Sequence, residues 1–397
     1  MTSAHELWDT PERRALAATV AAFTEREVVP HLAGWEDAGE VPRGLHERAA
    51  AIGLLELGFP PEAGGAGDFV DFMVANEQLI LSGGSTGVAS ALFTHSIGVP
   101  HIAAAGDPWQ LDEFVRPVLA GRKIAALGVT EPGTGSDVGA ITTRAVRDGE
   151  DYLVTGAKTF ITSGTRADFV TTAVRTGGPG HRGVSLLVVE ADRPGFAVSA
   201  RLRKMGWLCS DTAELAFDGV RVPARNLVGA EGTGFAQIMR RFESERLTMA
   251  VQAVATAERC ATLARAWARD RHTFGAPLDS RQVVRHKLAE MFRRVAVAKT
   301  FVRDVTARWS AGADVTEEVA MAKNTAVYAC DVVVNEAVQL HGGMGYMRES
   351  EVERHYRDAR ILGIGGGTNE IMNEIIAKRL LDRPGTAPGA ASTGGTR

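Results

Sequence analysis

The spacing of apolar residues divides the chain into three regions. In the first, which runs to about Arg122, apolar side chains recur at helical spacing behind Thr10 and Pro11, a pair typical of a helix start. A stretch rich in Gly and Pro, Gly53–Gly67, is expected to be a loop. Further helices are expected at Pro42–Leu54, Phe69–Leu81 and Trp109–Leu119.

From about Lys123 to Val228 the pattern changes to short β-branched segments separated by turn residues. Ile141–Gly156 predicts two strands around an Asp-Gly turn, and Gly177–Gly183 is expected to be an exposed hairpin tip. The other strand candidates read TFITS, DFVTTAV, GVSLLVVE and DTAELAFDGVRV. Six or more strands at this spacing favour a small barrel or sandwich.

Long helical patterns return from Gly229 to Asp382. The candidates are Phe235–Arg269, Arg281–Ala311, Thr316–Leu340 and Asn369–Leu381. Four helices with short connections predict an antiparallel bundle. The expected fold class is therefore α+β multidomain: an N-terminal all-α domain (1–122), a middle small β-barrel domain (123–228), a C-terminal four-helix bundle (229–382) and a disordered tail (383–397).

Length, charge and cysteine use narrow the function classes. The chain has 397 residues and a formal net charge of −4, which fits two or three domains and argues against nucleic-acid or anionic-membrane binding. The three cysteines form no CxxC pair, so neither a disulfide scaffold nor a cysteine metal site is expected. No signal peptide or run of about 18 apolar residues is visible, and a cytoplasmic location without a membrane span is expected.

The first candidate ligand-binding segment is LGVTEPGTGSD, Leu127–Asp137. Its glycines approach a Rossmann fingerprint, but a Thr-rich, strand-like segment follows where that motif needs a helix, so we reject the Rossmann reading. There is no Walker A motif either. A structural β-turn is one interpretation. The other is a site for a polar ring edge or carbonyl, because Thr130, Ser136 and several backbone N–H groups converge there.

Four more segments allow both a structural and a binding interpretation. In GAKTFITSG, Phe160 and Thr162 share a strand face that suits a flat heteroaromatic ligand, although this segment taken alone favours a core Phe. In RHTFGAPLDSRQ, Arg271 suits a phosphate or simply a helix end. The glycines of QLHGGMG are typical of a helix C-cap. The segment GIGGGTNE is a glycine run before a helix, with Thr368 as its expected N-cap. Both glycine runs also permit a ligand to approach the backbone closely.

Taken together and in this order, the five segments resemble the acyl-CoA dehydrogenase family, flavoproteins with a helix–barrel–helix architecture. The resemblance covers about Glu6 to Leu381. It implies FAD as cofactor, with flavin contacts from Leu127, Val129, Thr130, Gly135, Ser136, Phe160, Ile161, Thr162, Thr368 and Glu370. It also implies that a neighbouring subunit contributes Arg271, Phe274, Gln282, Gln339, Leu340, Gly342 and Gly343, and hence a homotetramer or homodimer.

The family's reaction needs a carboxylate that removes the α-proton of a thioester while the β-hydride goes to flavin N5. Many members carry this Glu in a Tyr-Glu-Gly-Thr run, which here reads Gly365-Gly366-Gly367-Thr368. A subset resembling the isovaleryl and long-chain enzymes carries it in a Glu-Arg-Leu context on a bundle helix, and this chain has Glu245-Arg246-Leu247. Substrate contacts are expected from Ser136, Phe242, Arg246, Gly366 and Gly367.

Periodicity alone does not select the base. Glu245 shares a helical stripe with Ile238, Phe242 and Met249, and an apolar wall raises the pKa of a carboxylate. Glu243 lies two residues away with apolar neighbours of its own, and either carboxylate could be a surface charge in the RRFESER run. The Glu-Arg-Leu match favours Glu245.

The expected function is FAD-dependent conversion of acyl-CoA to trans-2-enoyl-CoA, with electrons passed to an electron-transfer flavoprotein. The alternatives are an acyl-carrier-protein substrate, flavin oxidase or monooxygenase chemistry, and a flavin-binding protein without dehydrogenase activity. No metal is expected, because neither HExxH nor a close ligand pair occurs, and no GxSxG motif supports a hydrolase. The missing Glu at Gly366 leads to the hypothesis that a branched acyl chain fits near the α-carbon.

Overall fold

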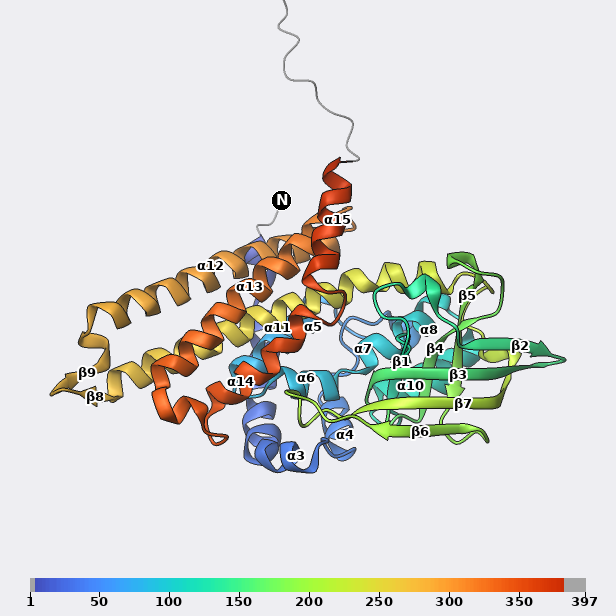
Figure 1. The fold of residues 1–397 in the computed structure, drawn as a ribbon, viewed down its shortest axis with the longest axis horizontal. Coiled ribbons are helices and arrows are strands. Elements are labelled where there is room, and N and C mark those ends of the chain that lie inside the picture. Colours follow the sequence, from blue (N-terminus) through green and yellow to red (C-terminus); the bar gives the residue numbers. More distant parts are fainter. Residues whose placement is uncertain (1–3, 382–397) are drawn as a thin grey trace, which may run out of the picture.

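The computed structural model describes residues 4–381 and consists of a helical region, a curled sheet and a bundle of long helices (Figure 1). This order confirms the fold class expected from the sequence. The disorder expected for residues 383–397 concerns a stretch outside the described residues. The boundaries chosen at residues 122 and 228 stay predictions.

From residue 4 onward, the N-terminal region contains ten α-helices, most of them short. Thr10 caps the second of them by accepting a hydrogen bond from Arg13 N (3.2 Å), as the Thr-Pro pair predicts. The helices are α1 (Ala4–Trp8), α2 (Pro11–Phe23), α3 (Leu32–Ala38), α4 (Gly44–Ala50), α5 (Phe69–Leu81), α6 (Thr86–Leu92), α7 (His95–Gly98), α8 (Pro100–Ala105), α9 (Pro108–Gln110) and α10 (Arg116–Leu119).

The helix expected at Trp109–Leu119 is interrupted by a π-helical turn at Leu111–Val115, between α9 and α10. Pro117 explains the interruption, because it has no N–H to donate to the carbonyl of Glu113 four residues earlier. Lys123 Nζ donates to that carbonyl instead, at 3.0 Å.

Seven strands form the curled sheet of the middle region. They are β1 (Ala125–Gly128), β2 (Arg144–Asp148), β3 (Asp151–Thr162), β4 (Phe169–Arg175), β5 (Val184–Glu190), β6 (Phe196–Arg201) and β7 (Thr212–Pro223). Their order is β1-β4-β2-β3-β7-β6, with β5 also paired to β4. β4 and β2 share only one residue pair, Arg144 with Arg175, so the sheet bends sharply there. β2 and β3 flank the predicted Asp-Gly turn.

The C-terminal region contains α11 (Gly234–Asp270), α12 (Gln282–Ser310), α13 (Thr316–His341), α14 (Glu351–Ala359) and α15 (Asn369–Leu381), and a two-stranded hairpin of β8 (His272–Thr273) and β9 (Ala276–Pro277). The four predicted helices occur within one residue of their expected bounds. The apolar pattern does not predict α14, because only Val352 and Ala359 supply apolar side chains to its buried face and the rest of that face is polar.

Two of the three hydrophobic cores cross the borders between regions. One joins α2 and α5 to α11, α12 and α13, and the second joins the N-terminal helices, one sheet face and Ile238 of α11. The third fills the inside of the curl around Tyr152 and Ile161. α11 therefore anchors both the sheet and the helices, which determines where its side chains lie relative to the sheet loops.

Among residues 4–381, no single helix is long and apolar enough to cross a membrane. One bent pair, Thr86–Leu92 with His95–Ala105, passes the same criteria of length and composition only together, with an angle of 57° between its two parts.

Candidate active site

Glu245 lies on α11 about three turns from the N-terminal end of the helix, and it is half-buried. Phe242 and Met249 share its helix face at i−3 and i+4. Phe242 packs against the core that contains Val129, which directs this part of α11 toward the loop after β1. The helix turn that carries the predicted base therefore packs on the same core as the predicted flavin loop.

The glycine run before α15 lies next to the Glu245 carboxylate. Gly366 has a φ of +61°, and a β-carbon added there would lie 3.5 Å from Glu245 Oε1 and 2.8 Å from Met249 Sδ. Any side chain at position 366 would need a strained backbone and a displaced Met249. The Met249 sulfur also occupies part of the space that the sequence left open for a branched acyl chain.

Two cations from the bundle hold the carbonyls of this loop. Arg246 Nε donates to the carbonyl of Gly366 at 3.1 Å. Lys323 Nζ, from α13, donates to the carbonyls of Gly365 and Gly367, each at 2.5 Å. Lys323 was not among the residues predicted from the sequence, where its only signal is a charge within the apolar face of the segment AMAKNTA.

The electrostatics of Glu245 combine two opposing effects. Burial raises the pKa of Glu245 above its ordinary value, and the charges of Lys323 and Arg246 oppose that rise. Burial in turn lowers the pKa of Lys323 to about 8, against the attraction of Glu245. A carboxylate with a raised pKa accepts a proton more readily, which is what a general base requires.

Glu243, the rival candidate, has other contacts. Its carboxylate accepts hydrogen bonds from Trp309 Nε1 at 3.0 Å and from Thr316 Oγ1 at 2.7 Å. These bonds link α11 to the end of α12 and the start of α13. The structure therefore gives Glu243 a structural role and leaves Glu245 as the carboxylate beside the glycine loop.

A buried ion pair anchors the Gly-rich loop that follows β1. Glu131 is 4% exposed and accepts hydrogen bonds from Lys158 Nζ (2.8 Å), Thr142 N (2.6 Å) and Thr143 N (2.9 Å). Burial alone would raise the pKa of Glu131, but Lys158 and these donors outweigh it and lower that pKa to about 2. The pair holds the loop against β3.

Neither packing nor backbone conformation requires glycine at positions 133 and 135 of this loop. A β-carbon at Gly133 or Gly135 would meet nothing within 4 Å, and neither residue has a positive φ. Gly135 and Ser136 are exposed. Glycine at such positions leaves the backbone open to close approach by a ligand.

The strand segment that follows is strained and open to solvent. Phe160 has a φ of +60° and is 67% exposed, so it is not a core residue. The register of β3 against β7 shifts between Lys158 and Ile161, which produces this bulge. Thr162 is half-buried, whereas the Ile161 side chain is buried inside the curl, so only its backbone is available to a ligand.

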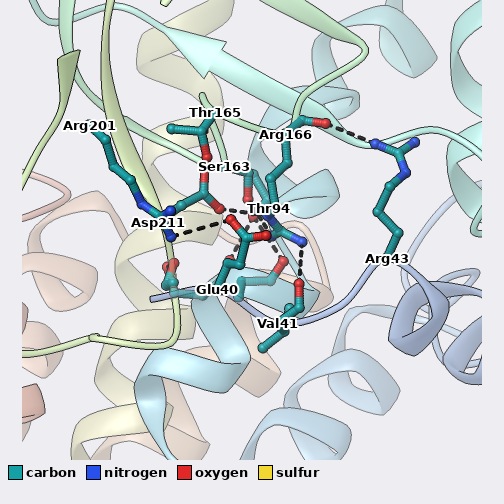
Figure 2. Close-up of polar contacts among 12 residues, drawn as sticks. Glu40, Val41, Arg43, Thr94, Ser163, Thr165, Arg166, Arg201 and Asp211 are labelled. Carbon is teal, nitrogen blue, oxygen red and sulfur yellow. Dashed lines mark hydrogen bonds and ion pairs between the residues drawn. The ribbon is translucent and has the colours of Figure 1, made fainter. Parts of the chain in front are cut away.

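A second buried network holds the turn after Thr162 (Figure 2). Ser163, with a φ of +59°, donates its N–H to the carbonyl of Asp211 (3.0 Å), and its hydroxyl lies 2.8 Å from that of Thr94. Asp211 pairs with Arg166 at 2.6 Å, with side chains 0% and 6% exposed. Arg166 also donates to the carbonyl of Val41 (2.9 Å), which ties the turn to the N-terminal helices.

The remaining predicted cofactor residues lie at the opposite end of the bundle. Arg271 follows the end of α11, about 40 Å along the helix from Glu245. In Figure 1 the hairpin β8–β9 and the end of α13 lie together at this far end, away from the sheet. That end carries Arg271, Phe274, Gln282, Gln339, Leu340, Gly342 and Gly343. Phe274, at the hairpin tip, is 98% exposed with a φ of +50°.

Thr368 and Glu370 lie at the start of α15, close to the glycine loop. Thr368 accepts a hydrogen bond from Ile371 N at 3.3 Å, as expected for an N-cap. The predicted residues thus form two groups in one chain: a near group around Glu245 and the sheet loops, and a far group at the hairpin.

The protein thus consists of a helical region, a sheet and a helical bundle, and a half-buried carboxylate on a bundle helix faces a glycine loop. Models of the acyl-CoA dehydrogenase N-terminal, middle and C-terminal domains match residues 10–122, 126–220 and 232–381. The chain therefore belongs to the acyl-CoA dehydrogenase family, which confirms the resemblance seen in the sequence motifs.

Known acyl-CoA dehydrogenases are similar to this chain over nearly its whole length. The mouse long-chain specific acyl-CoA dehydrogenase, mitochondrial, is 38% identical over 396 residues, covering 96% of this chain and 90% of the relative. A probable acyl-CoA dehydrogenase from Mycobacterium abscessus is 66% identical with a TM-score of 0.93, covering 94% of this chain and 100% of the solved one. A glutaryl-CoA dehydrogenase from Mycobacterium smegmatis, solved in complex with FADH2, is 26% identical with a TM-score of 0.87 and covers 98% and 100%.

Proposed function

We propose that this protein is a FAD-dependent acyl-CoA dehydrogenase that converts a saturated acyl-CoA to the trans-2-enoyl-CoA. The observation that carries the proposal is the Glu245 carboxylate, half-buried beside the backbone of Gly366. A general base next to a loop of glycines suits a thioester whose α-carbon must approach the carboxylate closely.

The residues of the near group fit a flavin. Gly133 and Gly135 leave room for close approach, and Phe160 offers an exposed aromatic face on the adjoining strand. Leu127, Val129, Thr130, Ser136, Phe160 and Thr162 would hold the isoalloxazine part, with Thr368 and Glu370 nearby. When bound, FAD supplies the acceptor for the hydride that leaves the β-carbon.

The residues of this chain account for the proton and for the charge on the thioester. Glu245 accepts the α-proton, and its raised pKa favours that transfer. Negative charge then develops on the thioester oxygen and needs a hydrogen-bond donor. Within residues 4–381 no hydrogen bond engages the amide of Gly366, so this N–H is free to donate to that oxygen.

A second copy of the chain completes the cofactor site in this proposal. The far group lies about 40 Å from Glu245 along α11, so one chain does not bring both groups to one ligand. The exposed Phe274 at the hairpin tip and the exposed Gly342 and Gly343 suit contact with a partner's flavin. An electron-transfer flavoprotein as acceptor and a cytoplasmic location stay predictions.

The test is an anaerobic titration of the FAD-loaded protein with saturated acyl-CoAs of different length and branching. Loss of the visible flavin band with some of them is the expected result, together with formation of the enoyl-CoA. In Glu245→Gln, flavin and substrate binding persist but the rate of bleaching falls by about 10²–10⁴-fold. Glu243→Gln is the matched control, and it keeps the rate within a few-fold while lowering the thermal stability.

Two results would overturn the proposal. Bleaching by no thioester would favour a carrier-protein substrate, or a flavin oxidase or monooxygenase reaction. Full turnover in Glu245→Gln would remove the base from its assigned position.

A further inference from the structure

Lys323 is an unusual residue in this bundle because its whole side chain is buried. It lies on α13 and is 0% exposed, in the turn that faces α11 and the glycine loop. Removing an ammonium group from water is costly unless partners compensate for the lost hydration. Its partners are the carbonyls of Gly365 and Gly367, each 2.5 Å from Nζ.

These contacts determine where the amide of Gly366 points. The carbonyl of Gly365 and the N–H of Gly366 belong to one peptide unit, and none of the described peptide bonds is cis. In a planar trans unit the two groups point in opposite directions. Lys323, by holding the Gly365 carbonyl, therefore directs the Gly366 N–H away from α13. Arg246, by holding the Gly366 carbonyl, orients the amide of Gly367 in the same way.

Lys323 also acts on the neighbouring carboxylate through its charge. The charged groups that act on Glu245 are Lys323 from α13 and Arg246 from its own helix, and both favour the ionised form. The charged groups that act on Lys323 are Glu245 and Arg246. The ammonium is thus linked to both parts of the reaction centre, the free amide and the base.

We propose that Lys323 is a positioning residue for the dehydrogenation, which aims the Gly366 amide at the thioester oxygen and places its ammonium charge on the same glycine loop that Glu245 faces. This inference rests on the proposed function of Glu245 and Gly366. A lysine with only a structural role would stabilise the loop but leave the protonation of Glu245 unchanged.

The experiment compares Lys323→Met with Lys323→Gln in the full-length, FAD-loaded protein. Met has a similar length but neither charge nor donor, whereas Gln retains a neutral N–H donor for one carbonyl. Lys204→Met is the matched control, since Lys204 Nζ donates to the carbonyl of Ser210 at 2.5 Å on the β6–β7 connection. The readouts are the pH profile of flavin reduction by a saturated acyl-CoA, the Kd for the enoyl-CoA product, and the flavin content.

Both Lys323 variants should shift the acidic limb of the pH profile upward by about one unit, because a nearby cation lowers a carboxylate pKa by 1–3 units. At a fixed pH below that limb, a shift of one unit is about a tenfold loss of rate. Lys323→Met should also weaken enoyl-CoA binding more than Lys323→Gln does. Lys204→Met should leave the limb and the Kd unchanged.

An acidic limb at the same pH in either folded variant, with an unchanged product Kd, would overturn the proposal. Should Lys323→Met fail to fold, the limb of Lys323→Gln decides the matter, because it also lacks the charge. Glu245→Gln, measured alongside, separates the two ideas. If it keeps full turnover, the proposed function fails; if it loses turnover while the Lys323 variants behave like the native protein, only the positioning role fails.

Discussion

The stability that the buried network after β3 contributes can be measured through Asp211. Its carboxylate accepts hydrogen bonds from Arg166 Nε (2.6 Å), Thr165 N (2.9 Å) and Thr165 Oγ1 (2.5 Å), and it is fully buried. Asp211→Asn keeps the shape but removes the charge, which leaves the Arg166 guanidinium buried without its counter-ion. Breaking such a pair costs about 3–5 kcal/mol.

The expected change in melting temperature follows from the size of the chain. An unfolding entropy of about 2.1 cal/mol/K per residue gives about 0.8 kcal/mol/K for 397 residues. A loss of 3–5 kcal/mol then lowers Tm by about 4–6 °C. The measurement is a thermal melt at constant protein concentration with saturating FAD, because ligand and assembly both shift Tm.

Asp148→Asn is the control, since Asp148 pairs with Arg221 at 2.7 Å on the same sheet with both side chains about half exposed. An exposed pair contributes about 0–1 kcal/mol, so Tm should fall by about 1 °C or less. Asp211→Asn should also lower the flavin content, because Arg166 and Thr165, which hold the turn after β3, then lose the carboxylate that they share. Equal Tm values for the two variants would refute the reasoning.

Three further outcomes are expected. Gly366→Ala should lower the rate of flavin reduction at least about tenfold with little change in flavin content. The β-carbon of the alanine would lie 2.8 Å from Met249 Sδ, on a backbone with a φ of +61°. A native rate in stopped-flow would contradict this prediction. Phe274→Ala should leave Tm of the fold nearly unchanged but weaken FAD retention in gel filtration, because this side chain touches almost nothing in its own chain; unchanged retention would argue against a partner role. The pKa of Glu131 lies at about 2 in the fold, below its ordinary value of 4.5, so its stabilisation is present above pH 4.5 and is lost as the pH falls toward 2. Tm should therefore fall less steeply between pH 5 and pH 3 in Glu131→Gln than in the native protein, and parallel curves would count against the buried pair.

Elements with strong local signals could be located from the amino-acid sequence. Long amphipathic repeats placed α11, α12 and α13 within one residue, because a helix of many turns repeats its apolar stripe often enough to be unambiguous. The start of α15 followed instead from the glycine run and the N-cap at Thr368. Alternating β-branched segments located the sheet, and ordered motifs led to the family. The polar helix α14 was missed, because its burial depends on ion pairs with distant parts of the chain, such as the one between Glu351 and Arg259.

The tertiary structure decided which of the neighbouring side chains faces the site. Helical periodicity did not distinguish Glu243 from Glu245 as the base. Trp309 and Thr316, which lie more than 60 residues away in the chain, donate hydrogen bonds to Glu243 and give it a structural role. Similarly, nothing local marked Lys323 as the group that holds the glycine loop. Such roles arise from packing between α11, α13 and the segment before α15, and a one-dimensional pattern carries no record of which helices meet.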